Sequence, residues 1–395
     1  MLGMWSRRGV MGLSLLSVTM AMTGGASAQT NAKQPARRAS QFRGDAGRSG
    51  QLDEVGPRGA VALVWRFPVP GAIRSTPVIS NGVLYVGSDA DGNLYAIDAA
   101  NGQFLWSAGA EGEIASSPAV FDGAVYFGRD DGSVNALSTE DGSRIWEFET
   151  GGAVRSSPAI VDGVLYIASE DGLLYALNAG DGAEIWRFGD EVFSSRGGGN
   201  NWLASSPAVG DGVVYAALDD EKLVAVDAVK GKLIWNVELI GDLVSSPAVV
   251  DGVIYIASQY GGLHALDATD GSELWAFADA AGEASPAVAD GVVYAGGRNG
   301  SLYAIDASDG SEHWSFETND RIVASPVVAG DLVYVASFDD VLYAVDRANG
   351  TENWYMTAVN DFVSSPLVWN GVVYSASLDG NLYAVAADPS QPDEE

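Results

Sequence analysis

Cysteine is absent from this 395-residue chain, and histidine occurs only twice. Without cysteine the chain can form no disulfide, no thiol nucleophile, no thiolate metal site and no lipid anchor on a cysteine. His264 and His313 have no second histidine or cysteine at ligand spacing, so we expect neither to bind a metal or act as a base. Serine-hydrolase elbows and phosphate-binding glycine loops are missing as well. The composition therefore disfavours most kinds of catalysis.

Basic residues are scarce. The chain has 21 lysines and arginines, only four of them lysine, against 52 acidic residues, and its formal net charge is −31. We do not expect so acidic a protein to bind nucleic acid, because the phosphates would repel it. Many acids stand in Asp-Gly pairs such as Asp131-Gly132 and Asp211-Gly212, where they form turns and keep the surface soluble.

Long apolar runs are missing too, except near the start of the chain. Residues 1–28 have the pattern of a signal peptide, with Arg7 and Arg8, an apolar run over residues 10–22 and small residues before a cleavage point near Ala28. The arginine pair leaves both the general secretory route and the twin-arginine route open. We expect a periplasmic or secreted protein whose mature chain has no transmembrane segment.

Two further segments lie outside any regular pattern. Residues 29–60 lack a period and are rich in arginine, glycine and glutamine, which predicts a flexible leader. Within this leader, Phe42-Arg43-Gly44-Asp45 resembles an integrin ligand, and we interpret that likeness as a coincidence. Residues 388–395 are predicted to form an acidic tail.

The sequence is rich in a repeat of about 40 residues. Each unit runs through variants of Ser-Ser-Pro-Ala-Val, Asp-Gly-Val-Val-Tyr, Leu-Tyr-Ala-Leu-Asp and Glu-Leu-Trp, and four short apolar runs at this period are typical of a propeller blade. The repeat prolines are Pro77, Pro118, Pro158, Pro207, Pro247, Pro286, Pro326 and Pro366. The repeat tryptophans, which we expect to fill the seams between blades, are Trp65, Trp106, Trp146, Trp186, Trp235, Trp275, Trp314 and Trp354.

One unit shows how a blade is built. In the third unit, residues 156–160, 164–168, 174–177 and 185–188 are four apolar runs rich in β-branched and aromatic residues. The first two are joined by Asp162-Gly163, a strong hairpin pattern because glycine tolerates the positive φ of a tight turn. Four antiparallel strands per unit predict an all-β fold, an eight-bladed β-propeller.

The ends of the repeat predict how the ring closes. The eighth unit ends without a tryptophan of its own, whereas Trp65 precedes the first proline unit. We therefore expect the strand around Trp65 to complete the last blade, which removes free sheet edges. The predicted propeller spans residues 61–387 and should be a monomeric ring.

The repeat is interrupted once. Pro158 and Pro207 are 49 residues apart, and the excess falls in residues 189–203, which include Arg196 and Trp202. Loops on a rigid scaffold often carry function, so this insertion is a candidate binding loop. A neutral surface insertion is the alternative.

The few basic residues point to one face of the predicted ring. Arg74 and Arg155 replace small residues at the start of inner strands, near the central channel. A basic mouth on an acidic ring would attract anions, so we predict a carboxylate-bearing ligand or an acidic partner segment there. Local salt bridges, with Asp130 or Glu283 for example, are the alternative. The candidate binding residues are Arg74, Arg129, Arg155, Arg196, Trp202, Arg298 and Arg321.

The repeats resemble a known family, the eight-bladed propellers with pyrroloquinoline-quinone-like repeats. The resemblance covers about residues 61–385 and rests on units such as residues 306–314, which follow an Ala-x-x-Gly-x-x-x-Trp pattern. One branch, similar to the outer-membrane assembly propeller BamB, docks proteins in the periplasm without catalysis. The other branch comprises quinoprotein dehydrogenases, which are longer and hold their quinone with an adjacent cysteine pair and a calcium ion.

We interpret the chain as a BamB-like, non-catalytic scaffold that binds envelope proteins or an anionic ligand. A quinoprotein dehydrogenase and a polysaccharide-binding or sensor propeller are the alternatives. We predict no catalytic residue, no metal site and no cofactor, although pyrroloquinoline quinone and calcium stay possible. Residues 89–93 begin like a calcium loop but lack the distal glutamate, so a turn is predicted there.

Overall fold

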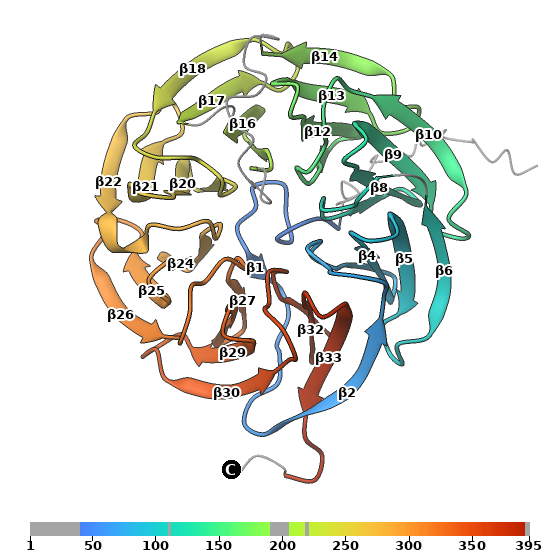
Figure 1. Cartoon of the computed structure of the whole chain (residues 1–395). Coiled ribbons are helices and arrows are strands. Elements are labelled where there is room, and N and C mark those ends of the chain that lie inside the picture. The colour runs from blue at the N-terminus through green and yellow to red at the C-terminus, as the bar shows by residue number, and fades with distance from the viewer. Residues whose placement is uncertain (1–39, 110–111, 190–204, 218–220, 392–395) are drawn as a thin grey trace, which may run out of the picture. The chain divides into compact units, whose positions relative to one another are not determined.

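The computed structural model describes residues 40–109, 112–189, 205–217 and 221–391, all within one compact unit of residues 37–395. Eight antiparallel sheets of four blade strands stand around a common axis (Figure 1). The predicted eight-bladed, all-β propeller is confirmed. Within the described ranges the only helical segment is the 3₁₀ turn η2 (Ala278–Ala280), and no helix there could cross a membrane.

Each blade begins with a three-residue strand that directly follows the repeat proline and faces the axis. Asp162 and Gly163 join the first two strands of the third blade with φ of 49° and 80°, the geometry of a type I′ hairpin turn. The innermost strands are β3 (Val78–Ser80), β7 (Ala119–Phe121), β11 (Ala159–Val161), β15 (Ala208–Gly210), β19 (Ala248–Val250), β23 (Ala287–Ala289), β27 (Val327–Ala329) and β31 (Leu367–Trp369).

The second and third strands of each blade are almost completely buried, because neighbouring blades cover both of their faces. The second strands are β4 (Val83–Gly87), β8 (Ala124–Gly128), β12 (Val164–Ala168), β16 (Val213–Ala217), β20 (Val253–Ser258), β24 (Val292–Gly296), β28 (Leu332–Ala336) and β32 (Val372–Ala376). The third strands are β5 (Asn93–Asp98), β9 (Ser133–Ser138), β13 (Leu174–Asn178), β17 (Lys222–Asp227), β21 (Gly262–Asp267), β25 (Ser301–Asp306), β29 (Val341–Asp346) and β33 (Asn381–Ala387).

The outermost strands carry the repeat tryptophans, and each strand is bulged at the residue before its tryptophan, such as Ile145 before Trp146. A bulge twists an edge strand and makes it a poor template for pairing with another chain. These strands are β6 (Phe104–Gly109), β10 (Arg144–Glu149), β14 (Glu184–Phe188), β18 (Leu233–Glu238), β22 (Glu273–Phe277), β26 (Glu312–Glu317), β30 (Glu352–Thr357) and β2 (Val61–Pro68). We number the blades by their innermost strands, from blade 1 at β3 to blade 8 at β31.

The predicted closure is confirmed. Strand β2 pairs in antiparallel fashion with β33, from Val61 opposite Ala387 to Pro68 opposite Asn381. The N-terminal strand thus forms the outer edge of blade 8, beside the C-terminal strand (Figure 1).

The tryptophans fill the seams between blades, as predicted. Trp146 of blade 2 donates its indole N–H to the carbonyl of Ala179 in blade 3 at 2.9 Å. Its ring covers Gly182, where a Cβ would lie 2.8 Å from the indole and where φ is +72°. Tyr126 packs against the same indole with its ring tilted by 45°, and it donates its hydroxyl to the same carbonyl at 3.0 Å. In the Ala-x-x-Gly-x-x-x-Trp pattern the alanine therefore supplies the carbonyl acceptor, and the glycine leaves room for the indole of the preceding blade. The tryptophan supplies the indole for the seam with the following blade.

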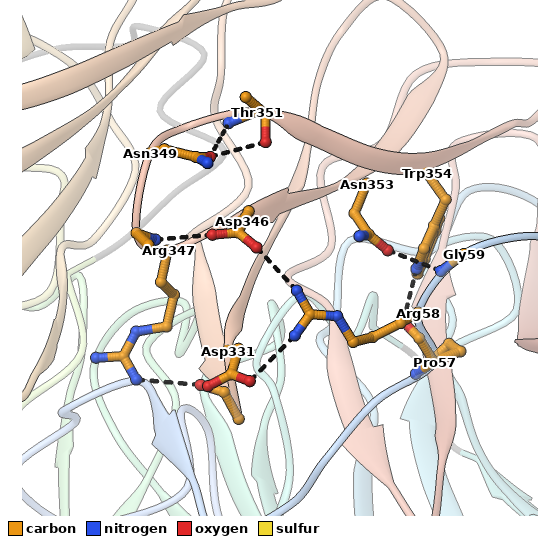
Figure 2. A network of polar contacts seen from close by, with 12 residues as sticks. Pro57, Arg58, Gly59, Asp331, Asp346, Arg347, Asn349, Thr351, Asn353 and Trp354 are labelled. Atoms are coloured by element: carbon orange, nitrogen blue, oxygen red, sulfur yellow. Dashed lines mark hydrogen bonds and ion pairs between the residues drawn. The ribbon is translucent and has the colours of Figure 1, made fainter. Parts of the chain in front are cut away.

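The seam between blades 7 and 8, here called the closing seam, is made differently. Blade 8 has no turn between β33 and β2, because the two strands come from opposite ends of the chain. Trp354 of blade 7 instead donates its indole N–H to the carbonyl of Pro57 at 2.8 Å. Arg58 then reaches Asp331 at 3.0 Å and Asp346 at 2.8 Å (Figure 2).

Candidate functional site: the channel and its mouth

The centre of the propeller is lined by a closed ring of hydrogen bonds. In every blade the backbone N–H of the residue before the repeat proline donates to the hydroxyl of the equivalent residue in the next blade, at 2.8 to 3.1 Å. From the sequence these residues were predicted only as parts of strands. The hydroxyl ring consists of Thr76, Ser117, Ser157, Ser206, Ser246, Ser285, Ser325 and Ser365.

Residues 40–52, here called the axial segment, lie inside the channel and are hydrogen bonded to its wall (Figure 1). They include β1 (Gln51–Leu52), which pairs in parallel with β27. In six blades the amide two residues after the proline donates to this segment. The pairs are Val120 with Ser40 O, Ile160 with Gln41 Oε1, Val209 with Ala46 O, Val249 with Gly47 O, Val288 with Ser49 O and Val328 with Gly50 O.

The prediction of a flexible leader is therefore wrong for residues 40–60. The innermost strands expose backbone donors toward the axis, and a chain segment that pairs with them satisfies groups that would otherwise be buried without partners. Residues 29–39 and the predicted signal peptide, residues 1–28, lie outside the described ranges.

Two arginines of the axial segment are buried, Arg43 with 4% and Arg48 with 0% of its surface exposed. Arg48 donates to the carbonyls of Pro207 at 2.6 Å and Ser157 at 2.7 Å, and Arg43 donates to Ser285 at 2.8 Å. Burial lowers the pKa of each guanidinium to about 9, so both remain charged at neutral pH. Backbone carbonyls thus solvate two cations and connect the segment to three blades.

Beside the axial segment a small cavity of about 60 Å³ opens at the channel mouth. The hydroxyl ring surrounds it, and the ring of Phe42 lies among its walls with Arg74, Arg155 and Glu283. The structure therefore brings two of the predicted arginines to the channel mouth.

Both arginines at the mouth have acidic partners. Arg155 contacts Asp130 at 2.7 Å and Glu170 at 2.6 Å. Arg74 contacts Asp89 at 2.8 Å and, across the seam to blade 2, Glu113 at 3.7 Å. The local salt bridges considered as an alternative are thus present at both positions.

Asp89 has an unusual environment. Burial raises the pKa of its carboxyl to about 7, and the attraction of Arg74 only partly opposes this effect. Since 7% of Asp89 is exposed, water does little to stabilise its charge.

Three other predicted binding residues, Arg129, Arg298 and Arg321, are not among the residues that line the mouth cavity. Arg298 is 3.7 Å from Glu283, and Arg321 lies over the ring of Phe338 at 4.2 Å. Arg129 is buried near the ring of Phe127, and this burial lowers the pKa of its guanidinium. The remaining two, Arg196 and Trp202 of the long insertion, fall outside the described residues.

A quinone cofactor with a metal ion needs a group of metal ligands and a cavity large enough for the cofactor. In the described part of the chain no group of three or more His, Cys, Asp or Glu side chains could hold a metal. The mouth cavity of about 60 Å³ is small beside the roughly 300–1,000 Å³ of ordinary ligand sites. A wider hollow of about 680 Å³ includes Asp53, Glu54, Asp290 and Asp331 in its lining, together with Arg347, which Asp290 already pairs at 2.9 Å. This acidic excess would repel a carboxylate-bearing quinone. These residues do not fit the cofactor.

Sequence comparison identifies the family. Residues 55–188, 170–286 and 260–360 match the family described as outer membrane protein assembly factor BamB. The chain belongs to this BamB family. No curated protein sequence matches the chain.

Solved structures share the BamB-family fold at low sequence identity. BamB from Moraxella catarrhalis has 18% identity and a TM-score of 0.69, with 85% of this chain and 100% of that chain covered. A europium-containing methanol dehydrogenase has 13% identity and a TM-score of 0.74, with coverages of 88% and 98%. A quinohemoprotein alcohol dehydrogenase from Comamonas testosteroni has 16% identity and a TM-score of 0.71, with coverages of 90% and 81%. At these identities the likeness concerns the fold alone.

Proposed function

We propose that this BamB-family propeller is an exported scaffold that binds other proteins of the cell envelope and does not catalyse a reaction. The observation that carries this proposal is the occupation of the channel by the axial segment. Hydrogen bonds from six blades and two buried arginines hold that segment. The occupied channel leaves mainly the two faces and the rim for binding, and these suit macromolecules better than small substrates. The family description supports a role in outer-membrane assembly.

The channel mouth is the first candidate surface for an acidic partner. Arg74 and Arg155 each hold two carboxylates, and an incoming acidic segment could exchange with the more exposed ones, Glu113 and Glu170. The double variant Arg74→Ala, Arg155→Ala should weaken such binding. Unchanged binding of every partner by this variant would remove the mouth from the proposal.

A photo-crosslinking experiment tests the scaffold function. A benzophenone amino acid replaces Glu113, on the mouth face, or Ile145, which is 49% exposed on the outer strand of blade 2. We expect defined envelope proteins to be crosslinked from position 113 in native cells, with few adducts from position 145. No protein adduct from either position would contradict the scaffold proposal.

The structural likeness to dehydrogenases justifies a parallel test of an enzyme. Purified protein is mixed with pyrroloquinoline quinone and calcium, and its absorbance and dye-linked alcohol oxidation are measured. We expect neither quinone binding nor oxidation. A stoichiometric spectral change with dye reduction would favour the dehydrogenase and overturn the non-catalytic proposal.

A further inference from the structure

The axial segment accepts a hydrogen bond from the amide two residues after the proline in six blades and not in the other two, although the Ser40 hydroxyl donates to the carbonyl of Ile79 in blade 1. The amides of Ile79 in blade 1 and Val368 in blade 8 occupy the position two residues after the proline, as in the other six blades. Neither donates a hydrogen bond to the axial segment, nor to any other described loop. Blades 8 and 1 are neighbours in the ring, so the two donors face one gap.

The sheet register shows where these donors point. Val368 lies opposite Val373, as Val120 lies opposite Val125 in blade 2, and the Val120 amide turns away from its own blade to Ser40. Along an antiparallel pair, the backbone N–H and C=O groups of one residue bond the paired strand, and those of the next residue point away from it. The amides of Val368 and Ile79 therefore point toward the channel.

A cavity of about 190 Å³ lies in front of these strands. Its lining includes residues 76–79 and 365–369 of these two blades, together with Leu52, Asp53 and Glu54. Val368 is only 1% exposed, and an amide buried without a partner is costly. The two ends of the axial segment border the cavity, because both Ser40 and Leu52 line it.

We propose that this cavity, the edge gap, binds a short extended peptide segment of a partner protein. Backbone carbonyls of the peptide would accept hydrogen bonds from Val368 and Ile79, so the peptide adds a strand to the channel wall. Leu52 and Leu367 offer an apolar surface for one side chain. Arg43 also lines the cavity, but its guanidinium is bonded to the carbonyls of Ser285 and Arg48. The carboxylates of Asp53 and Glu54 therefore favour a lysine or arginine next to that side chain. This inference rests on the scaffold function and names a site and a partner chemistry for it.

Amide measurements test the premise and then the binding. In the isolated protein, hydrogen exchange at Ile79 and Val368 should be faster than at Val209 and Val249, whose amides bond the axial segment. Equal protection of all four amides would overturn the proposal, since another part of this chain or a second copy would then cover the gap. Dilution would lower the protection of these amides if a second copy covers the gap, and would leave it unchanged if the same chain does.

The probe is the peptide acetyl-Lys-Val-Val-Lys-amide, and acetyl-Glu-Val-Val-Glu-amide is its matched control. In an NMR titration the basic peptide should shift the amide resonances of Ile79 and Val368 saturably and leave those of Val209 and Val249 unchanged. The acidic peptide should bind more weakly. Absence of saturable shifts, or equal shifts at all four amides, would overturn the proposal.

Two variants separate peptide binding from folding. Val368→Pro removes one backbone donor and should abolish the shift of the Ile79 amide resonance by the basic peptide. A thermal melt shows whether the variant is folded. Should this variant not fold, Asp53→Asn keeps both backbone donors. It should weaken the affinity for the basic peptide by up to about fivefold, because one surface ion pair is lost. Equal affinity of Asp53→Asn and the parent would contradict the predicted partner charge.

The outcomes distinguish this proposal from the scaffold function. Crosslinks from position 113 without any shift of amide resonances by the peptide would support the scaffold function and contradict the edge gap as a binding site. Peptide shifts without crosslinked envelope proteins would leave the edge gap and remove the scaffold function as stated.

Discussion

Seven seams of the propeller share one construction, and the closing seam reaches the same packing with different residues. In an ordinary seam the turn of the next blade supplies the carbonyl and the glycine that receive the tryptophan, as Ala179 and Gly182 do for Trp146. At the closing seam Pro57 supplies the carbonyl for Trp354, and both indoles are equally well buried, at 8% and 5% exposure. A seam therefore needs a covered indole and one acceptor, whatever part of the chain provides them.

The two kinds of seam differ in their tyrosines. The hydroxyl of Tyr126 bonds Ala179, whereas the buried hydroxyl of Tyr334 at the closing seam has no partner among the described residues. Gly56 passes so close that a Cβ there would lie 2.0 Å from the Tyr334 hydroxyl oxygen. The closing seam thus keeps the apolar packing and lacks one polar contact.

The largest expected effect tests whether the two seams are equivalent in packing. Trp146→Ala and Trp354→Ala should each lower the free energy of unfolding by about 3–5 kcal/mol, because each leaves a cavity between two blades. Urea denaturation followed by circular dichroism measures both. A much smaller loss for Trp354→Ala would show that the closing seam is weaker than its geometry indicates.

A second prediction concerns charge across an ordinary seam, where Arg74 lies between Asp89 of blade 1 and Glu113 of blade 2. The folded state raises the pKa of Asp89 from 3.8 to about 7, so it binds a proton that the unfolded chain has released. Stability should therefore fall as pH rises through this window, by at most about 1.4 kcal/mol per pH unit from this group.

The variant Asp89→Asn isolates this contribution. Its unfolding free energy, measured by urea titration between pH 4 and pH 7, should fall less with pH than that of the parent protein. Identical pH slopes would show that Asp89 titrates normally.

A third prediction concerns the tyrosine hydroxyls of the two kinds of seam. Tyr126→Phe should cost about 1 kcal/mol, because it removes a buried hydrogen bond to Ala179. Tyr334→Phe should be neutral or slightly stabilising, because it removes a buried hydroxyl without a partner. Thermal unfolding of the two variants side by side gives the difference. Equal destabilisation would mean that the Tyr334 hydroxyl is bonded after all.

The smallest effect concerns the arginine at the closing seam. Arg58 is 39% exposed, so its contacts with Asp331 and Asp346 are partly screened by water. Arg58→Ala should lower stability by at most about 1 kcal/mol, and the loss should shrink in high salt. Arg144→Ala, which breaks an exposed pair with Glu147 within one strand, is the matched control and should change less. A loss at Arg58 of several kcal/mol would show that ring closure depends on this ion pair.

The repeat made the fold predictable because its information is local. Each Asp-Gly turn and each apolar run specifies its own hairpin, and the position of Trp65 ahead of the first unit was enough to predict closure by β2. The hydroxyl ring could have been found in the same way, since a hydroxyl before each proline recurs in all eight units. It was missed because its partner is in the next blade, about 40 residues away.

The axial segment could not be predicted in this way. Backbone carbonyls of the segment accept five of the six hydrogen bonds from the innermost strands, and the Gln41 side chain accepts the sixth. Such bonds leave almost no pattern of side chains in the segment. Two features did point to it. Glycine recurs at positions 44, 47 and 50, and Arg43 and Arg48 stand in a chain with few basic residues. Arg43-Gly44-Asp45, which we interpreted as chance, lies within the segment that enters the channel.

The axial segment also constrains how the protein can fold. It is the first described part of the chain, yet its partners are spread from Val120 to Val328, and the strand that follows it pairs with β33. Contacts between such distant positions form late, because large loops must close before any of them is gained. The ring can therefore be completed only after the last blade has formed, because β2 pairs with the final strand, β33.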